Sequence, residues 1–499
     1  MATGIVSWGT YLPYWRLRRE SIAAAFGTSG GKGSRAVASY DEDTTTLGVE
    51  AARRALRPDG VPDPDDVLFS TPDPAYLDKT NATTIHAALG LAPGAGAYDL
   101  CGSVRSSWAT MRLAARSGEH RPTLAVVSDL RTGLAGGAEE SQAGDGAVAF
   151  LFAPTGGVAE VLGEASATDE FLDRWRVPGE TASRQWEDRF GEEVLVPPGR
   201  TAFAEALARA GLTAGEVDHL VVAGLHARAV TSLRGSLGVD RQHWAPDHGS
   251  RIGNLGAAQA AMALADVLER AAPGEVIAVV ELADGADAVV LRTTPALEEA
   301  RAARRRAGLV AVADAAEQGR DDLPYAVFLT WRGQLRREPP RRPDPERPDA
   351  PAMRRNEDWK FSFAASRCQL CGFMHLPPTR VCLSCRSVDR MEPRRLADVR
   401  GTVATYTVDH LAFSLSPPMV GAVVDFDGGG RYRGEMTDVD PGSLAIGTRV
   451  EMTFRRFYTA QGVHNYFWKA RPVSDQTDQS DQSGHPESGL VAESTAAQA

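Results

Sequence analysis

The sequence predicts a duplicated, layered α/β region followed by a small cysteine-rich ribbon and a small β-barrel. Three observations support this fold class. Strand-like apolar runs alternate with helical patterns over residues 4–295, which is typical of layered α/β domains. The later part of this region repeats the earlier part, which indicates two similar halves. Two Cys-X-X-Cys pairs and then short strands with glycine-rich turns follow, and these indicate a metal-binding ribbon and a barrel.

The composition is that of a globular protein. The 499 residues are 43% hydrophobic and 24% charged, and this length predicts about three domains. No apolar run is long enough to cross a membrane, and we expect no signal peptide. The net charge of −11 argues against a nucleic-acid partner, because phosphate binding needs a basic surface. Of the five cysteines, four stand in the two pairs, which favours a reducing, cytoplasmic location.

The first half, residues 1–155, supplies the clearest elements. Apolar runs predict strands at residues 5–8, 67–70, 123–128 and 146–152, and helical spacing predicts helices at residues 44–56 and 83–89. Residues 97–111 begin extended, turn through small residues, and enter a helical pattern at Trp108. The free N–H groups and the dipole at a helix start favour a thiolate. Cys101 in this turn is therefore a candidate nucleophile, and a small buried hydrophobic residue is the alternative.

The second half, residues 156–295, repeats this order. A helical pattern, an acidic turn and a buried strand occur at residues 45–70 and again at residues 201–222, and both halves end on a strand that begins Asp-Gly-Ala. Two such halves pack face to face, and ligand sites form where they meet.

Two polar residues of the second half suit such a site. His226 follows the predicted strand at residues 220–223, and Asn254 lies between glycines before a helix that starts near Ala257. Histidine suits proton transfer near neutral pH, and an asparagine amide can donate to an oxyanion. A helix-capping asparagine and a surface or core histidine are the alternatives.

Together these features resemble the thiolase superfamily, above all its 3-hydroxy-3-methylglutaryl-CoA synthase and ketosynthase III branches. The resemblance rests on Asp99 and its small-residue turn, on His226, and on residues 4–6, 11–13, 40–44, 78–82, 144–147 and 253–254. It implies a duplicated five-layered α-β-α-β-α fold, usually dimeric, that acts on acyl-CoA or acyl-carrier thioesters. A cysteine of the first half would accept the acyl group. A histidine and an asparagine, at the positions of His226 and Asn254, would polarise the acceptor carbonyl.

The sequence departs from the family pattern at the nucleophile and the base. Counted from Asp99, the nucleophile position holds Val104, and Cys101 comes three residues earlier. The glutamate base of the synthase branch aligns with Pro72. Valine cannot be acylated.

Several alternatives therefore stay open at these two positions. The acyl group could be carried by Cys101, by Ser103 or Ser106, or by no residue at all. Asp73 could serve as the base, and a turn residue between two prolines is its alternative role.

Residues 296–355 are expected to form a helical and Pro/Arg-rich linker. A helix is expected over residues 297–318, with a basic run at residues 301–306 that is either a solvated face or a contact for the phosphates of coenzyme A. Residues 338–353 are crowded with proline and arginine, which predicts an extended segment.

The two cysteine pairs carry the strongest motif in the chain. They lie in residues 356–395 and comprise Cys368, Cys371, Cys382 and Cys385. Two such knuckles bring four thiolates into a tetrahedron that suits Zn²⁺. Because four sulfurs leave no open coordination position, we expect a structural, rubredoxin-like zinc ribbon, and iron is the alternative metal.

A barrel is expected over residues 396–473. Short strands are predicted at residues 402–408, 419–426, 431–437, 449–457 and 466–471, which suggests an OB-type fold. Ribbon plus barrel resembles the accessory family that bridges to thiolase-like subunits and helps hold acyl-CoA, so a thiolase-like partner subunit is a further possibility. Residues 474–499 are expected to be a disordered acidic tail.

We therefore expect a cytoplasmic, dimeric enzyme that forms a carbon–carbon bond next to an acyl thioester by condensation and acyl transfer. A retro-aldol lyase without an acyl-enzyme, and a non-catalytic scaffold that binds acyl-CoA, are the alternatives. Nucleic-acid binding by the barrel would rest on fold alone.

Overall fold

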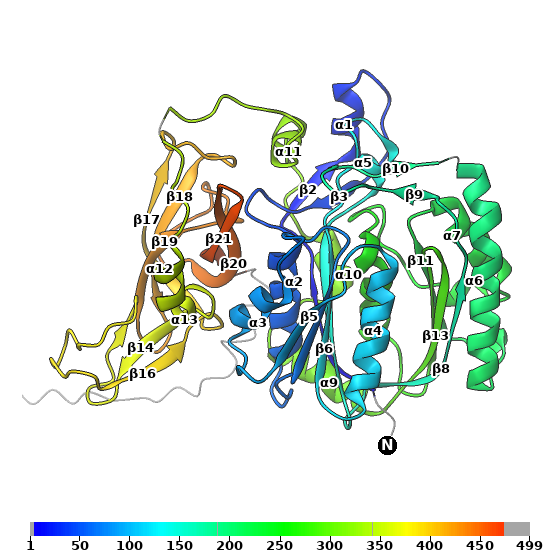
Figure 1. Ribbon diagram of the computed structural model, residues 1–499, viewed down its shortest axis with the longest axis horizontal. Coiled ribbons are helices and arrows are strands. Elements are labelled where there is room, and N and C mark those ends of the chain that lie inside the picture. Colours follow the sequence, from blue (N-terminus) through cyan, green and yellow to red (C-terminus); the bar gives the residue numbers. More distant parts are fainter. Residues whose placement is uncertain (1–3, 187, 342, 474–499) are drawn as a thin grey trace, which may run out of the picture.

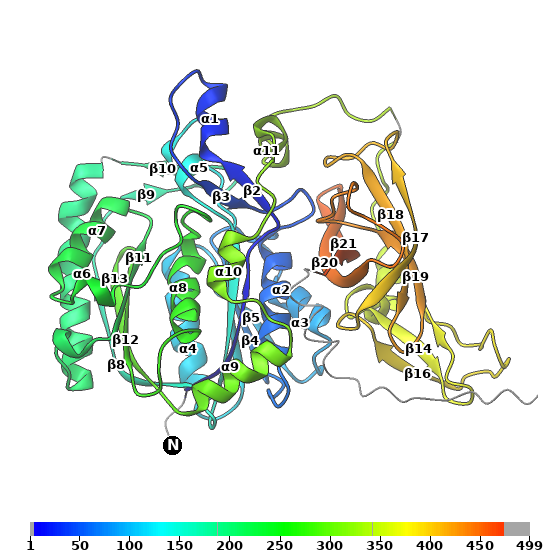
Figure 2. The ribbon, with the colours of Figure 1, turned by 180° about the vertical axis from the view of Figure 1, so that it is seen from behind.

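The computed structural model describes residues 4–186, 188–341 and 343–473. The expected acidic tail lies outside the described residues. Figure 1 shows a layered body with a barrel at its side, and Figure 2 shows the same arrangement from behind.

The first half forms one side of the central sheet. Its strands are β1 (Gly4–Tyr11), β4 (Asp66–Ser70), β5 (Gly96–Asp99), β6 (Thr123–Asp129) and β7 (Gly146–Ala153), in the spatial order β1-β7-β6-β4-β5. Its main helices are α2 (Thr44–Leu56), α3 (Ala82–Leu89) and α4 (Arg105–Gly118). Because β4 is parallel to both β5 and β6, their carboxyl ends meet at one edge of the sheet.

The second half repeats this order of strands and helices, except that one strand is shortened to a single bridge. Its strands are β8 (Ala159–Thr168), β11 (His219–Gly224), β12 (Val276–Leu282) and β13 (Gly285–Thr293), and its helices are α6 (Asp188–Ala210), α7 (Ala227–Ser236) and α8 (Gln259–Leu268). The counterpart of β5 is reduced to one bridge between Leu220 and Trp244. The helix expected near residues 201–208 is longer than its pattern indicated, since it begins at Asp188 and runs through Pro197 and Pro198.

The halves stack in five layers. Helices α6 and α7 cover one outer face, α2 and α3 cover the other, and α4 and α8 lie between the two parts of the sheet (Figures 1 and 2). A short pairing of β1 with β8, at Gly4 and Ile5, joins the two parts into one sheet. This arrangement confirms the predicted α-β-α-β-α fold class.

The first residues of helices α2 and α4 were predicted with different success. The side chain of Asp43 accepts a hydrogen bond from the backbone N–H of Thr46, and the Thr46 hydroxyl in turn bonds the Asp43 backbone. This capping box fixes the start of α2 at Thr44, as expected. Helix α4 begins at Arg105, with Val104 as its N-cap residue. The expectation of a start at Trp108 was wrong, because the polar first turn carries no apolar periodicity.

The linker is more broken than the sequence pattern indicated. The single helix expected over residues 297–318 is two helices, α9 (Ala296–Arg306) and α10 (Val312–Glu317). The break follows from Gly308, whose φ of 67° is left-handed and cannot continue an α-helix. Further short helices are α11 (Tyr325–Trp331), α12 (Ala350–Arg355) and α13 (Glu357–Lys360).

The five barrel strands fall where they were expected, and three further short strands form the ribbon. The ribbon contains β14 (Ala364–Cys368), β15 (Met374–His375) and β16 (Met391–Arg395), and the barrel contains β17 (Gly401–Asp409), β18 (Met419–Phe426), β19 (Arg431–Glu435), β20 (Arg449–Ala460) and β21 (Val463–Pro472). The barrel order is β19-β18-β17-β20-β21, with a bridge from Met436 to Ala470. One hydrophobic core runs from α2 into the barrel.

The remaining elements lie at the rim of the body: β2 (Trp15–Arg18), α1 (Arg19–Ala25), β3 (Ser34–Val37), α5 (Ala138–Gln142), β9 (Arg174–Trp175) and β10 (Arg184–Gln185). Within the described ranges, none of the helices has both the length and the apolar character that crossing a bilayer would require.

Candidate functional site

A large cavity lies at the carboxyl ends of strands from both halves. Its volume is about 780 Å³. Loops after β4 and β5 supply Asp73, Cys101 and Val104, and the segment after β11 supplies His226. Ligands in open α/β sheets bind at this end of the strands, so the topology places these predicted residues where chemistry is expected.

A second cavity adjoins the first. It has a volume of about 620 Å³ and is lined by His226 and Asn254, among others. His226 therefore lines both cavities, Cys101 and Val104 line the first, and Asn254 lines the second. His226 and Asn254 line the same cavity, as the duplication predicted. The Cys101 thiol and the Asn254 carboxamide line different cavities.

Asp99 fixes the turn that carries Cys101. Its carboxylate accepts hydrogen bonds from the backbone N–H groups of Asn81, at 2.6 Å, and Ala82, at 2.7 Å. Cys101 follows Leu100, the first residue after β5, and Gly102 N–H donates to Thr71 O at 3.2 Å. The N-terminus of α4 is occupied instead by Val104, which is 9% exposed.

The surroundings of Cys101 disfavour its thiolate. Burial and the nearby Asp99 carboxylate raise the pKa of the Cys101 thiol to about 11. The sequence suggested that a helix N-terminus would favour the anion, but the thiol lies before the helix and beside a negative charge. Its proton must be removed by another group before it can act as a nucleophile.

His226 is held in one tautomer. It is the N-cap residue of α7, and its Nδ1 accepts the backbone N–H of Ala229 at 3.1 Å. An accepting Nδ1 leaves the ring proton of a neutral imidazole on Nε2. The residue as a whole is 3% exposed. A Cβ atom on Gly191 would lie 2.8 Å from Nε2, so glycine is needed where the first turns of α6 pass the imidazole.

Asn254 both caps its own loop and faces the second cavity. Its Nδ2 donates to Gly224 O at 2.8 Å, and its Oδ1 accepts Gly256 N–H at 2.9 Å. Gly256 has a φ of 57°, and a Cβ there would lie 2.0 Å from Asp129 Oδ2. The capping alternative and the binding role are therefore compatible, since the amide nitrogen carries a second hydrogen.

Charged residues that the sequence did not single out complete the first cavity. Arg176 Nη1 lies 3.1 Å from Asp73 Oδ1, and burial raises the pKa of the Asp73 carboxyl. Arg131, Arg174 and Asp173 also line the cavity. These side chains come from the segment between β8 and α6 and from the loop after β6. The one feature of the sequence that could have pointed to these charged residues is the unusually long stretch without periodicity before the helix expected at residue 201.

The ribbon brings its four cysteines together. The Sγ atoms of Cys368, Cys371, Cys382 and Cys385 all lie within 4.8 Å of one another. The Sγ–Sγ distances are 3.6 Å for Cys368–Cys385 and 3.5 Å for Cys371–Cys382. A tetrahedron of Zn–S bonds of about 2.3 Å needs sulfurs about 3.8 Å apart, so the arrangement fits a metal ion.

Comparisons with known proteins agree with both parts of the fold. Residues 394–455 match the family model described as ChsH2, C-terminal OB-fold domain. The chain is 31% identical over 351 residues to a hydroxymethylglutaryl-CoA synthase of Aeropyrum pernix, covering 67% of this chain and 95% of that protein. The chain belongs to the hydroxymethylglutaryl-CoA synthase family. Another synthase, from Pyrococcus horikoshii, is 30% identical over 310 residues, covering 60% of this chain and 88% of that protein.

Solved structures show how far the hydroxymethylglutaryl-CoA synthase fold extends along the chain. The structure "MvaS in complex with 3-hydroxy-3-methylglutaryl coenzyme A" superimposes with a TM-score of 0.56 at 19% identity, covering 69% of this chain and 94% of that one. A 3-oxoacyl-(acyl carrier protein) synthase III of Pseudomonas aeruginosa gives a TM-score of 0.53 at 20% identity, covering 59% of this chain and 99% of that one. At these identities the likeness concerns the fold.

Proposed function

We propose that this chain is an acyl-CoA or acyl-carrier dependent condensing enzyme that forms a carbon–carbon bond in the paired cavities around His226. Membership of the hydroxymethylglutaryl-CoA synthase family supports the class of reaction. The single observation that supports the site is the place of His226 at the boundary of two cavities built from both halves. An acyl thioester in one cavity and its partner in the other would meet at the imidazole.

The second half would stabilise the negative charge that develops on a thioester oxygen. His226 would donate from Nε2–H, since its Nδ1 already accepts from Ala229. Asn254 would donate its second amide hydrogen, since the first is directed to Gly224 O. Fixed donors of this kind stabilise an oxyanion without reorganisation during the reaction. The imidazole takes part in this step as a hydrogen-bond donor.

The first half would supply the base. The Asp73 carboxylate lies in the first cavity, and its raised pKa makes it a better proton acceptor than an exposed aspartate. It would remove the proton from the carbon next to the donor thioester. The resulting carbanion would attack the acceptor carbonyl, and the alkoxide formed there would take up the proton held by Asp73. Arg176, 3.1 Å away, would hold the carboxylate in place.

No covalent acyl-enzyme can form at Val104, because valine has no nucleophile. Cys101 is the acyl carrier that can be tested in the same cavity, and its protonated thiol requires activation before any transfer. Substitution Val104→Cys would restore a thiol at the N-terminus of α4, where the helix dipole lowers a thiol pKa.

The test is incubation with acetyl-CoA and a set of 3-oxoacyl-CoA acceptors, followed by mass analysis of products and of the intact protein. We expect condensed product from the wild-type protein and from Cys101→Ala, and loss of product with His226→Ala, Asn254→Ala and Asp73→Asn. An acetyl adduct is expected on Val104→Cys. Product formation that survives both His226→Ala and Asn254→Ala would refute the proposal.

The ribbon is proposed to bind Zn²⁺ as a structural ion. Four thiolates leave no coordination position for substrate, so the metal would hold the knuckles and take no part in bond formation. Metal analysis of the purified protein, compared with a Cys382→Ser variant, tests this assignment. Iron in place of zinc would give visible absorption.

A homodimer is proposed through the exposed edge of the first half. β5 ends the order of the sheet, and Tyr98 on it is 55% exposed. An unpaired edge strand is a ready site for strand pairing. Light scattering of the wild-type protein and of a Tyr98→Lys variant tests this proposal. We also propose a cytoplasmic location, because unpaired cysteines suit a reducing compartment.

A further inference from the structure

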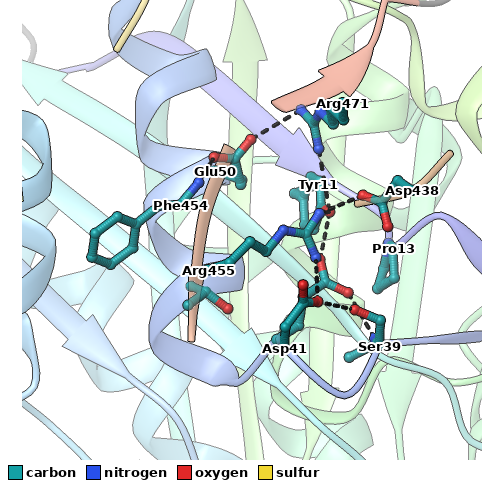
Figure 3. Close-up of polar contacts among 12 residues, drawn as sticks. Tyr11, Pro13, Ser39, Asp41, Glu50, Asp438, Phe454, Arg455 and Arg471 are labelled. Carbon is teal, nitrogen blue, oxygen red and sulfur yellow. Dashed lines mark hydrogen bonds and ion pairs between the residues drawn. The ribbon is translucent and has the colours of Figure 1, made fainter. Parts of the chain in front are cut away.

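The C-terminal barrel is fixed to the first half by a buried network of charges (Figure 3). Arg455 of β20 is fully buried. Its guanidinium lies 2.5 Å from Glu42 Oε1 and 3.5 Å from Asp41 Oδ1, both in the loop before α2. It also pairs with Asp438 of the barrel and donates to Tyr11 Oη at 3.1 Å. One side chain of the barrel is thus held by three carboxylates in a site without water access.

Neighbouring barrel residues extend this attachment. Lys469 Nζ lies 3.0 Å from Asp41 Oδ2, and Arg471 Nη2 lies 3.0 Å from Glu50 Oε2 on α2. The hydroxyl of Tyr466 donates to Asp43 Oδ2 at 2.8 Å. Because these contacts are short, directional and buried, the barrel has little freedom to rotate on the body.

The end of the β20–β21 hairpin contacts the loop after β4. The backbone N–H of His464 donates to Tyr76 Oη at 2.7 Å, and the two rings lie 4.8 Å apart. His464 Nε2 lies 3.4 Å from Ala75 O, while its Nδ1 lies 2.8 Å from Thr459 Oγ1. A tautomer protonated on Nε2 satisfies both contacts, with the threonine hydroxyl as the other donor.

That same loop forms a wall of the first cavity. Its lining residues include Asp73 and Tyr76. The backbone of Tyr76 exchanges two hydrogen bonds with the side chain of Asn81, at 3.0 and 2.9 Å. Thr44 Oγ1, next to the residue that Tyr466 contacts, donates to Asp73 O at 2.7 Å. The barrel therefore reaches the loop at both ends, through Tyr76 and through the start of α2.

We propose that the barrel sets the position of Asp73 in the cavity, with His464 and Tyr76 as positioning residues that join the hairpin to the loop. The barrel is then part of the condensing site of its own chain. The inference rests on the proposed function of Asp73. It explains why the barrel is attached by buried charges to the segment that precedes the cavity wall.

The test compares Tyr76→Phe, which removes the acceptor of the His464 N–H, with Tyr458→Phe. Tyr458 lies on the same hairpin, and its hydroxyl contacts Glu346 O in the linker instead. Displacement of a reacting group by about 1 Å can cost about a hundredfold in rate. We expect Tyr76→Phe and His464→Ala to lower kcat about ten- to a hundredfold with KM changed less than twofold, and Tyr458→Phe to retain the wild-type kcat.

Two further measurements separate positioning from damage to the fold. His464→Gln, whose side-chain amide can donate to Ala75 O, should recover part of the lost kcat. Hydrogen exchange of residues 71–81 should become faster in His464→Ala, while exchange in β17 stays unchanged. Unchanged kcat and unchanged loop exchange in His464→Ala would overturn the inference. Absence of turnover in the wild-type protein, or full turnover by Asp73→Asn, would instead refute the proposed function.

Discussion

Replacing Arg455 by methionine should weaken the attachment of the barrel to the body. The guanidinium is fully buried and faces Asp41, Glu42 and Asp438. Its removal leaves three buried carboxylates with only part of their compensating charge. Breaking a buried ion pair on one side costs about 3–5 kcal/mol, and methionine of similar length fills the space without restoring charge. We expect a loss of stability of this size.

Urea unfolding of the full chain measures this loss. It should be followed both by circular dichroism and by hydrogen exchange in β20 and β21, because a multi-domain chain need not unfold in one step. The matched control is Arg431→Met, which breaks an ion pair with Asp425 whose side chains are 67% and 46% exposed. Exposed pairs contribute little, so the control should keep the wild-type midpoint.

A second substitution identifies the source of the loss. Burial raises the pKa of Glu42 to about 7, so this carboxylate has the most to gain from being neutral once Arg455 is absent. The double variant Arg455→Met/Glu42→Gln should therefore be more stable than Arg455→Met alone. The reasoning fails if Arg455→Met is no less stable than Arg431→Met, or if the double variant is the less stable of the two.

Three more predictions concern other parts of the chain. Burial and Asp287 raise the pKa of Glu281 from 4.5 to about 8, so the folded state holds a proton that the unfolded chain releases. Stability should then fall between pH 4.5 and 8 by up to about 1.4 kcal/mol per pH unit. Glu281→Gln should flatten this slope in urea titrations, and an unchanged slope would contradict the assignment. Gly191→Ala should displace His226 and lower kcat about tenfold or more with a nearly unchanged melting temperature; full activity would show that α6 does not constrain the ring. Chelation of zinc should unfold the ribbon, seen as fast hydrogen exchange at Cys382, while the sheet of the body stays protected; protection of the ribbon without metal would refute its structural role.

Much of the fold could be predicted because its signals are local. The apolar spacing of α2 and the Asp43 cap together fixed that helix, and the spacing of the cysteine pairs predicted a cluster that the structure brings together. The duplication was readable because both halves bury the same kind of strand after the same kind of helix. Where local signals were weak the expectations were wrong, as at the polar first turn of α4 and at the left-handed Gly308.

The candidate site was only partly predictable. His226 and Asn254 were placed in one cavity by the symmetry of the two halves. The raised pKa of the Cys101 thiol depends on burial and on Asp99, and neither follows from a helix pattern. The sequence could not predict the partners of Asp73 and Tyr76. Asp73 pairs with Arg176 and Tyr76 with His464 of the barrel, and both partners are remote in the sequence.

By itself the sequence determined the periodicities: the repeated α/β pattern, the two cysteine knuckles and the five short strands of the barrel. These patterns can be read from neighbouring residues, because the spacing of apolar side chains along a helix or strand, and of cysteines in a knuckle, is set over a few residues. Only the tertiary structure decided that Arg176 meets Asp73 across 103 residues and that His464 meets Tyr76 across 388. Such contacts form only when packed elements exclude water and bring remote side chains together. No pattern of neighbouring residues predicts which remote residues will meet.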